Sequence, residues 1–143
     1  LLGENFRENP REFIKAKEWL GDRIVQYGYL SKREDYEKIL LNGSVVVSTA
    51  IQENFGISVV EAIAAGNHPL LPHRLSYPEV IPEKYHESCL YEEDSDLVEK
   101  LKKVLLERPP ADRIGLSIKM KRYSWEDLIY YYDSLFEESA KRC

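Results

Sequence analysis

The run of residues 44–49 constrains the fold of this chain more than any other feature of the sequence. It reads SVVVST, and its consecutive valines leave neither face of an extended segment polar. β-branched residues favour extended backbone, and strands that are apolar on both faces are typical of parallel sheets covered by helices. The run therefore predicts a central strand of a parallel sheet.

Short apolar runs alternate with helical patterns along the rest of the chain. Further strands are predicted at residues 24–27, 68–71 and 89–91, and residues 72–82 are predicted to form a loop punctuated by prolines. Apolar spacing with caps and stop residues predicts a set of helices: one from Asn9-Pro10 to Gly21, one from the Ser31 capping box to Asn42-Gly43, one over 55–66, one from 94–96 to Pro109-Pro110, one over 112–121, and one opened by Ser124. This alternation predicts an α/β fold, a Rossmann-like parallel sheet with helices on both faces.

Length and charge narrow the class of protein. The 143 residues fit one domain, 1–143, which is large enough to bury a core without disulfides or metals. A net charge of −5 argues against this chain alone binding a nucleic-acid backbone.

Other features bear on where the protein acts. The sequence contains no apolar stretch of about 18 residues, so no membrane helix is predicted. Cys89 and Cys143 are expected to be reduced thiols, as in a cytoplasmic protein. The chain opens with Leu1 rather than Met, and we expect a fragment whose upstream part is missing.

Ligands of parallel sheets bind at the carboxyl ends of the strands, so the loop after residues 44–49 is the informative one. Glu61 is the only charged residue between Phe55 and Arg74, and it is predicted to be buried. A buried carboxylate needs partners. Two vicinal ribose hydroxyls would serve, and so would an internal arginine or backbone amides, and the local pattern does not choose between them.

The residues before this helix suit a sugar phosphate. Asn54, Phe55 and Gly56 stand at the helix mouth, where amides lack intrahelical partners and a glycine lets a phosphate approach. The alternative is an N-cap asparagine followed by a packing glycine. Glu53 would lie in the loop, where its carboxylate can accept hydrogen bonds from sugar hydroxyls. The alternative there is a solvated surface glutamate.

The spacing of Glu53 and Glu61, with Phe55-Gly56 between and EAIAAG at residues 61–66, resembles the E-x7-E signature of retaining GT-B glycosyltransferases of the glycosyltransferase 4-like group. The order of elements resembles the C-terminal, nucleotide-sugar-binding domain of that fold. The segments VVSTAIQENFG and LPHRLSYPEVIP resemble the tRNA-queuosine mannosyltransferase family.

The resemblance implies roles for particular residues. Glu53 would be the catalytic-site carboxylate that holds hydroxyls of the donor hexose, and Glu61 would hold the ribose hydroxyls. The donor loop would comprise Asn54 together with Phe55, Gly56, Ile57 and Ser58, the last four offering backbone amides to the sugar and diphosphate. The segment of Gly28, Tyr29 and Leu30 would line the base pocket. The resemblance further implies a GDP-mannose donor, no metal cofactor, and an acceptor such as queuosine in tRNA.

The resemblance also implies missing parts. The basic side chains that clamp the diphosphate, and the N-terminal domain that binds the acceptor, would lie upstream of Leu1. We therefore expect no transferase activity from this chain alone. Two alternatives stay open: a related transferase that uses another nucleotide sugar on a lipid or glycan, and a silent α/β module in which Glu53 and Glu61 pair internally.

Two further sets of residues invite interpretation. His68, His73 and His86 show no recognised metal-ligand spacing with cysteines or carboxylates, so no metal site is predicted. The last helix is predicted to carry an apolar face of Trp125, Leu128, Ile129, Tyr132, Leu135 and Phe136. Tyr130 and Tyr131 lie off that face, available to dock on the missing domain or to pack within this one.

Overall fold

The computed structural model describes residues 11–107 and 113–141. The chain divides into two compact units, Leu1–Ile39 and Leu40–Cys143, which are described one at a time. The predicted helix opening at Asn9-Pro10 and the predicted helix end at Pro109-Pro110 lie outside the described residues. That residues 1–143 act as one domain stays a prediction.

The first unit is helical. Helix α1 (Arg11–Leu20) ends where the sequence predicts, and the short 3-10 helix η1 (Gly21–Arg23) continues it. Residues 24–27 do not form the predicted strand, and only Gly28 beyond them makes an isolated β-bridge. Val25 is 92% exposed, so the run has β propensity but lacks the packed neighbours that turn propensity into a strand. Helix α2 (Arg33–Asn42) begins in this unit and ends just before Gly43, as predicted.

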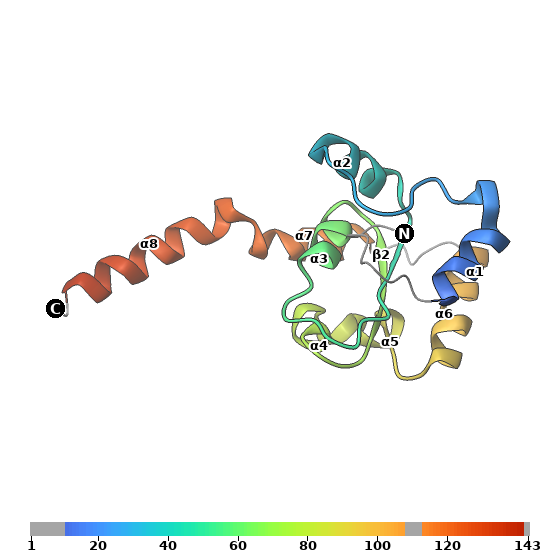
Figure 1. Cartoon of the computed structure of the whole chain (residues 1–143). Coiled ribbons are helices and arrows are strands. Elements are labelled where there is room, and N and C mark those ends of the chain that lie inside the picture. Colours follow the sequence, from blue (N-terminus) through green and yellow to red (C-terminus); the bar gives the residue numbers. More distant parts are fainter. Residues whose placement is uncertain (1–10, 108–112, 142–143) are drawn as a thin grey trace. The chain divides into compact units, whose positions relative to one another are not determined.

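The second unit is built on a parallel sheet. Strands β1 (Val45–Val47), β2 (His68–Pro72) and β3 (Leu90–Tyr91) follow the spatial order β1-β2-β3, which confirms the predicted parallel α/β architecture (Figure 1). Within the described residues β2 is central and β1 lies at the edge, so the predicted central position of residues 44–49 is wrong. Strand β2 pairs on both sides and is buried throughout, whereas Val47 is 42% exposed. Helices on both faces stay a prediction.

Helices connect the strands and follow the sheet. Helix α3 (Ile57–Ala64) links β1 to β2, and α6 (Asp94–Glu107), α7 (Arg113–Met120) and α8 (Trp125–Lys141) follow β3. The link between β2 and β3 holds three short pieces: α4 (Tyr77–Val80), the 3-10 helix η2 (Glu83–Tyr85) and α5 (His86–Cys89).

The predicted loop at residues 72–82 is therefore wrong in part, because α4 lies inside it. Pro78 stands in the first turn of α4, where its missing N–H removes no helical hydrogen bond. Cys89 closes α5 instead of opening a strand. It is a buried free thiol, as the prediction of reduced cysteines requires, while Cys143 lies outside the described residues.

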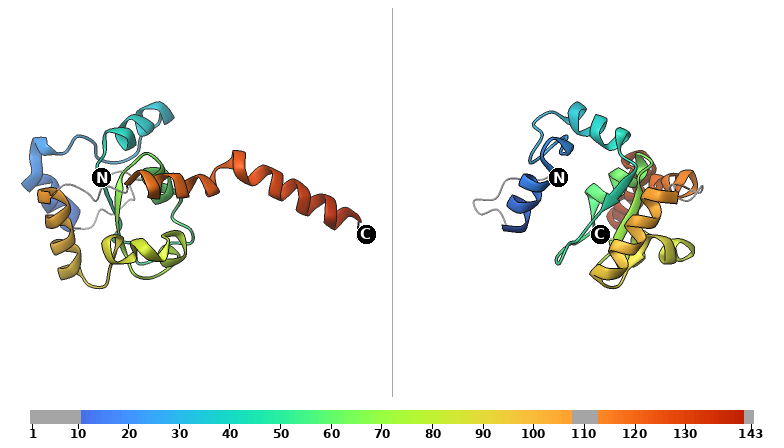
Figure 2. Two further views of the ribbon diagram at one scale, coloured as in Figure 1. Left: turned by 180° about the vertical axis from the view of Figure 1, so that it is seen from behind. Right: turned by 90° about the vertical axis from the view of Figure 1, so that its right-hand side faces the viewer.

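The core of the second unit forms between the sheet, α3 and α7. Figures 1 and 2 show α7 beside α3, and the Ser117 hydroxyl of α7 donates to the Ala64 carbonyl at the end of α3 over 2.7 Å. The buried apolar side chains at the centre are Val60, Ile63, Leu71, Tyr77, Ile81, Leu116 and Met120. This packing fixes α3, and with it the loop that precedes α3.

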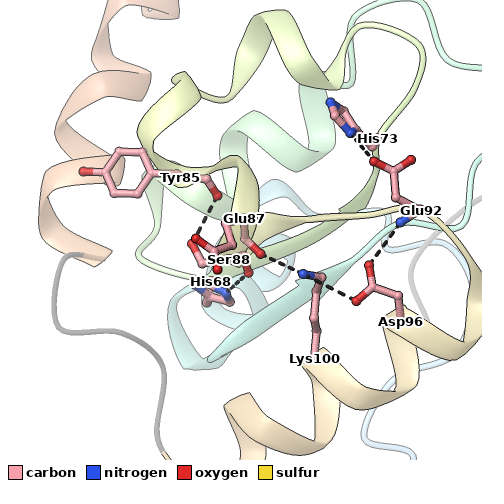
Figure 3. Close-up of polar contacts among 8 residues, drawn as sticks. All are labelled: His68, His73, Tyr85, Glu87, Ser88, Glu92, Asp96 and Lys100. Carbon is pink, nitrogen blue, oxygen red and sulfur yellow. Dashed lines mark hydrogen bonds and ion pairs between the residues drawn. The ribbon is translucent and has the colours of Figure 1, made fainter.

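Polar contacts fasten the link between β2 and β3. His68 Nε2 lies 3.1 Å from the Ser88 carbonyl, and the Lys100 ammonium of α6 donates to the Glu87 carbonyl over 2.7 Å (Figure 3). At the opposite ends of the strands, His73 Nδ1 and the Glu92 carboxylate form a hydrogen bond, and each residue lies one position past the end of its strand. Both ends of β2 and β3 are thus pinned by side chains.

Helix α8 differs from the other long elements of this unit because none of its residues is buried. The Ser124 hydroxyl accepts from the Asp127 amide over 3.3 Å, which confirms the predicted N-cap. Its predicted apolar face remains largely open, with Phe136 70% exposed. Of the described helices, α8 included, none combines the length and apolar character that a membrane span needs.

Candidate functional site

The candidate site lies at the carboxyl end of β1, in the loop of residues 48–56 that leads into α3. Because β1, β2 and β3 are parallel, the loop after β1 emerges at the same edge of the sheet as residue 73 after β2 and residue 92 after β3. This edge is where parallel α/β sheets bind ligands. The segments 48–56 and 73–77 are therefore the ones that can form a site together.

Gly56 shapes the entrance to α3. It is the N-cap residue and holds a left-handed backbone with φ 81°, which glycine adopts without steric cost. Its carbonyl accepts from the amides of Val59 and Val60, each over 3.0 Å. Ile57 and Ser58, the first two residues of α3, are exposed. That the amides at this helix mouth bind an anion stays a prediction.

Glu53 lies close to Gly56. Its side chain is half-buried, its Cγ is 3.7 Å from the place a Cβ at residue 56 would take, and its Oε1 accepts from the Asn54 amide over 3.0 Å. Each oxygen of a carboxylate can accept further hydrogen bonds.

Asn54 is not the N-cap of α3, because that position belongs to Gly56 two residues later. The alternative of an N-cap asparagine is therefore wrong.

Glu61 is exposed, so the prediction of a buried carboxylate is wrong. Helix α3 buries Val59, Val60, Ala62 and Ile63, while Ser58, Glu61 and Ala64 are exposed at a spacing of three residues on another face. The small apolar residues around Glu61 hid this two-sided pattern in the sequence. An exposed carboxylate can still accept hydrogen bonds from sugar hydroxyls. Because Glu61 is not buried, however, it does not need such partners to offset a cost of burial.

Phe55, just before α3, is held by two contacts. Its ring meets that of Tyr123 edge to face with centroids 5.0 Å apart, and its carbonyl accepts from the Ser76 hydroxyl over 3.2 Å. The structure therefore places Glu53 to Gly56 at the end of the loop and Ile57 in the first turn of α3, with contacts from Tyr123 and Ser76.

Sequence analysis missed the residues that hold the beginning of the loop. The Ser48 hydroxyl lies 2.8 Å from the Tyr77 hydroxyl, and the Ser48 carbonyl accepts from the Tyr91 hydroxyl over 2.8 Å. The Arg74 guanidinium donates to the Ala50 carbonyl over 3.2 Å. An aromatic residue just before Pro78, in a segment expected to be a loop punctuated by prolines, was the available signal.

The two tyrosines keep their protons at neutral pH. Burial raises the pKa of Tyr77, the hydrogen bond with Ser48 lowers it, and the Glu53 carboxylate raises it, with a net increase. Burial is also the largest cause of the raised pKa of Tyr91, which Arg74 opposes. Both hydroxyls are thus available as donors at the base of the loop.

The predicted base-pocket residues belong to the other unit. Gly28 is buried with φ 92°, Tyr29 is 67% exposed and Leu30 is half-buried. Their part in a common site with Glu53 stays a prediction.

The histidines are engaged with backbone or carboxylate partners. His86 Nε2 lies 2.7 Å from the Ile81 carbonyl, and His73 pairs with Glu92. Across residues 11–107 and 113–141, no three His, Cys, Asp or Glu side chains gather as metal ligands would.

Comparison with known proteins agrees with this fold. A sequence model of the family "Glycosyl transferases group 1" matches residues 2–121, which is most of the chain. The parallel α/β fold, together with this match, marks a Rossmann-like domain of the GT-B type. The chain belongs to the group 1 glycosyl transferases.

Two of the curated relatives that match the chain show how far the similarity extends. The chain is 34% identical to a tRNA-queuosine alpha-mannosyltransferase of Drosophila melanogaster over 96% of its own length and 36% of the relative's. It is 24% identical to one of the subunits of the phosphatidylinositol N-acetylglucosaminyltransferase of Arabidopsis thaliana, over 91% of the chain and 29% of that protein. The chain thus spans about a third of the length of these relatives.

Proposed function

We propose that this chain is the donor-binding part of a retaining glycosyltransferase that moves mannose from GDP-mannose to queuosine in a tRNA. The observation that carries the proposal is the 34% identity to a tRNA-queuosine alpha-mannosyltransferase over nearly the whole chain. An acceptor of this kind favours a cytoplasmic location.

The loop supplies the chemistry that the donor needs. Glu53 accepts hydrogen bonds from hydroxyls of the hexose, and Glu61 accepts them from the ribose. The amides of Ile57 and Ser58, with the positive end of the α3 dipole, face the diphosphate. Charge that develops on the leaving diphosphate is stabilised there by fixed dipoles, and this supports transfer without a metal cofactor.

The proposal assigns acceptor binding to the rest of the enzyme. The net charge of −5 does not suit a tRNA surface, and the relatives are about three times as long as the chain. The basic diphosphate clamp and the acceptor domain therefore lie in the N-terminal part of the full protein. The chain by itself is expected to bind donor weakly and to transfer nothing.

A second candidate function is transfer of an N-acetylhexosamine to a lipid. The similarity to the phosphatidylinositol N-acetylglucosaminyltransferase protein supports it, although at lower identity. The two candidates differ in donor, so the nucleotide that the chain prefers separates them.

The test is an amide-resolved NMR titration of the chain with GDP, UDP and ADP. We expect GDP to bind with a Kd on the order of 0.1–1 mM, about 4–5 kcal/mol, and to shift the amides of residues 53–61. Glu61→Gln on α3 should weaken binding, while the control Glu99→Gln, at an exposed position of α6, should not.

Each outcome has a definite meaning. Preference for UDP would favour the lipid-directed alternative. Binding that both variants leave unchanged would remove Glu61 from the site. Absence of binding by all three nucleotides, both to this chain and to the full-length enzyme, would contradict the donor-binding role and favour a silent module.

A further inference from the structure

The loop that carries Glu53 is contacted at several points by one neighbouring segment, residues 74–77. Arg74 donates to the Ala50 carbonyl over 3.2 Å, the Ser76 hydroxyl donates to the Phe55 carbonyl over 3.2 Å, and the Tyr77 hydroxyl meets the Ser48 hydroxyl over 2.8 Å. These contacts reach the start of the loop at residues 48 and 50 and its end at residue 55.

Tyr77 spans the loop from one end to the other. Its hydroxyl lies at Ser48, whose own hydroxyl also accepts from the Ala50 amide over 3.3 Å. Its ring lies under Gly56, with Cε1 only 3.0 Å from the place a Cβ at that residue would take. Tyr77 is 1% exposed, so its ring has a single well-packed position.

The backbone before Tyr77 has an unfavourable conformation that serves these contacts. Leu75 adopts φ 61° and is the only non-glycine residue with positive φ among the described residues. Residues other than glycine rarely adopt this left-handed region of backbone conformation. The turn at Leu75 lets Arg74 on one side and Ser76 with Tyr77 on the other reach the same loop. Strain of this kind persists where surrounding contacts hold it, and it clusters at functional sites.

We propose that Tyr77 is a positioning residue for Glu53, acting through Ser48 at one end of the loop and Gly56 at the other. The proposal rests on the donor-binding role of that loop. We assign Tyr77, which is buried, no contact with the donor. Its hydroxyl fixes where the loop leaves β1, its ring fixes where the loop enters α3, and Glu53 stands between these two points.

The electrostatics agree with this arrangement. After burial and the bond with Ser48, the Glu53 carboxylate is the next influence on the pKa of Tyr77, and it raises that pKa. The charge of Glu53 is therefore close enough to act on the hydroxyl, which stays protonated and able to donate.

A purely structural role would make Tyr77 one more buried aromatic residue. Tyr77→Phe separates the two roles because it keeps the ring under Gly56 and removes only the hydroxyl. The matched control is Tyr85→Phe, which removes a hydroxyl from another buried tyrosine of the same core, on η2. Ser48→Ala removes the same bond from its other end.

The experiment measures all variants as the whole chain, by amide NMR and by titration with GDP-mannose. GDP is the reference ligand, because it lacks the hexose that Glu53 is proposed to hold. The Asn54 amide, which donates to Glu53, and the Ala50 amide, which donates to Ser48, report the loop directly. In Tyr77→Phe we expect both amides to shift, their order parameters to fall from about 0.85 toward 0.6, and GDP-mannose affinity to drop about 3–10-fold, which is the effect of one hydrogen bond, while GDP affinity stays the same. Ser48→Ala should do the same, and the double variant should lose little more.

The result that would overturn the proposal is a Tyr77→Phe variant whose Asn54 and Ala50 amides and GDP-mannose affinity match the wild type. Equal changes in Tyr77→Phe and Tyr85→Phe would also overturn it, because they would mark a general packing effect. If neither the wild-type chain nor the full-length enzyme binds a nucleotide, the proposed function fails, and the two amides still decide whether Tyr77 positions Glu53.

Discussion

Four tyrosines of this chain form two contrasting pairs, one at the loop after β1 and one on helix α8. Tyr77 and Tyr91 are 1% and 2% exposed, and both hydroxyls bond Ser48. Tyr130 and Tyr131 on α8 are 79% and 58% exposed. The same side chain is a structural support in one place and an open surface in the other. An aromatic residue stabilises a fold only where an opposing surface completes its packing.

The largest expected effect is a difference in stability between variants at two leucines. Leu71 on β2 is fully buried, while Leu135 on α8 is 38% exposed. Leu71→Ala should lower the free energy of unfolding by about 2–5 kcal/mol, because it leaves a cavity. Leu135→Ala should cost less than about 1 kcal/mol. Urea unfolding of both variants measures the difference, and similar losses would mean that α8 is packed in solution.

A smaller effect is expected from two glycines with positive φ. Gly56→Ala adds a left-handed penalty and a tight contact with the Tyr77 ring, about 1–3 kcal/mol together. Gly66→Ala, at φ 94° with nothing within 4 Å of the new Cβ, bears the penalty alone, about 1–2 kcal/mol. The difference in unfolding free energy isolates the ring contact. Equal losses of unfolding free energy would show that the Tyr77 ring moves away from the new Cβ without a cost in stability.

The third test uses pH. The folded-state pKa of Tyr77 and of Tyr91 is raised above the unfolded value, so their contribution to stability is fully present below about pH 10 and is lost as pH rises through the folded pKa. Stability measured from pH 8 to 11 should therefore fall, and Tyr77→Phe should flatten that fall. Tyr130→Phe on α8 should not change it, and a flattening there would contradict the division of the tyrosines.

The smallest effect concerns metal removal. If fixed amides at the mouth of α3 receive the diphosphate, EDTA should change GDP affinity by less than about 2-fold. Titration with EDTA and with added magnesium measures this. A loss of GDP binding in EDTA that magnesium restores would mean that a bridging cation, rather than the amides at the mouth of α3, holds the diphosphate.

The sequence predicted the architecture better than the surroundings of individual side chains. Parallel strands at 45–47, 68–72 and 90–91 and the helix ending before Gly66 were predictable, because β-branched runs and glycine stops are local signals. The position of β1 in the sheet was not, since it depends on which strands pair with it.

The errors at Glu61 and at residues 24–27 share a cause. Whether a carboxylate is buried depends on which face of α3 meets α7, and whether four β-prone residues form a strand depends on a partner. Neither is encoded in the segment itself. Tyr77 was missed for the same reason, because its partners Ser48 and Gly56 are distant in the sequence.

The close approach of the Tyr77 ring to Gly56 has a consequence for how this family can vary. Two positions that leave each other no spare volume cannot change independently. A relative with a larger residue at the position of Gly56 is expected to carry a smaller side chain at that of Tyr77, and a relative that keeps the tyrosine is expected to keep the glycine. Natural sequences should therefore show these two positions changing as a pair, although 21 residues separate them in the chain.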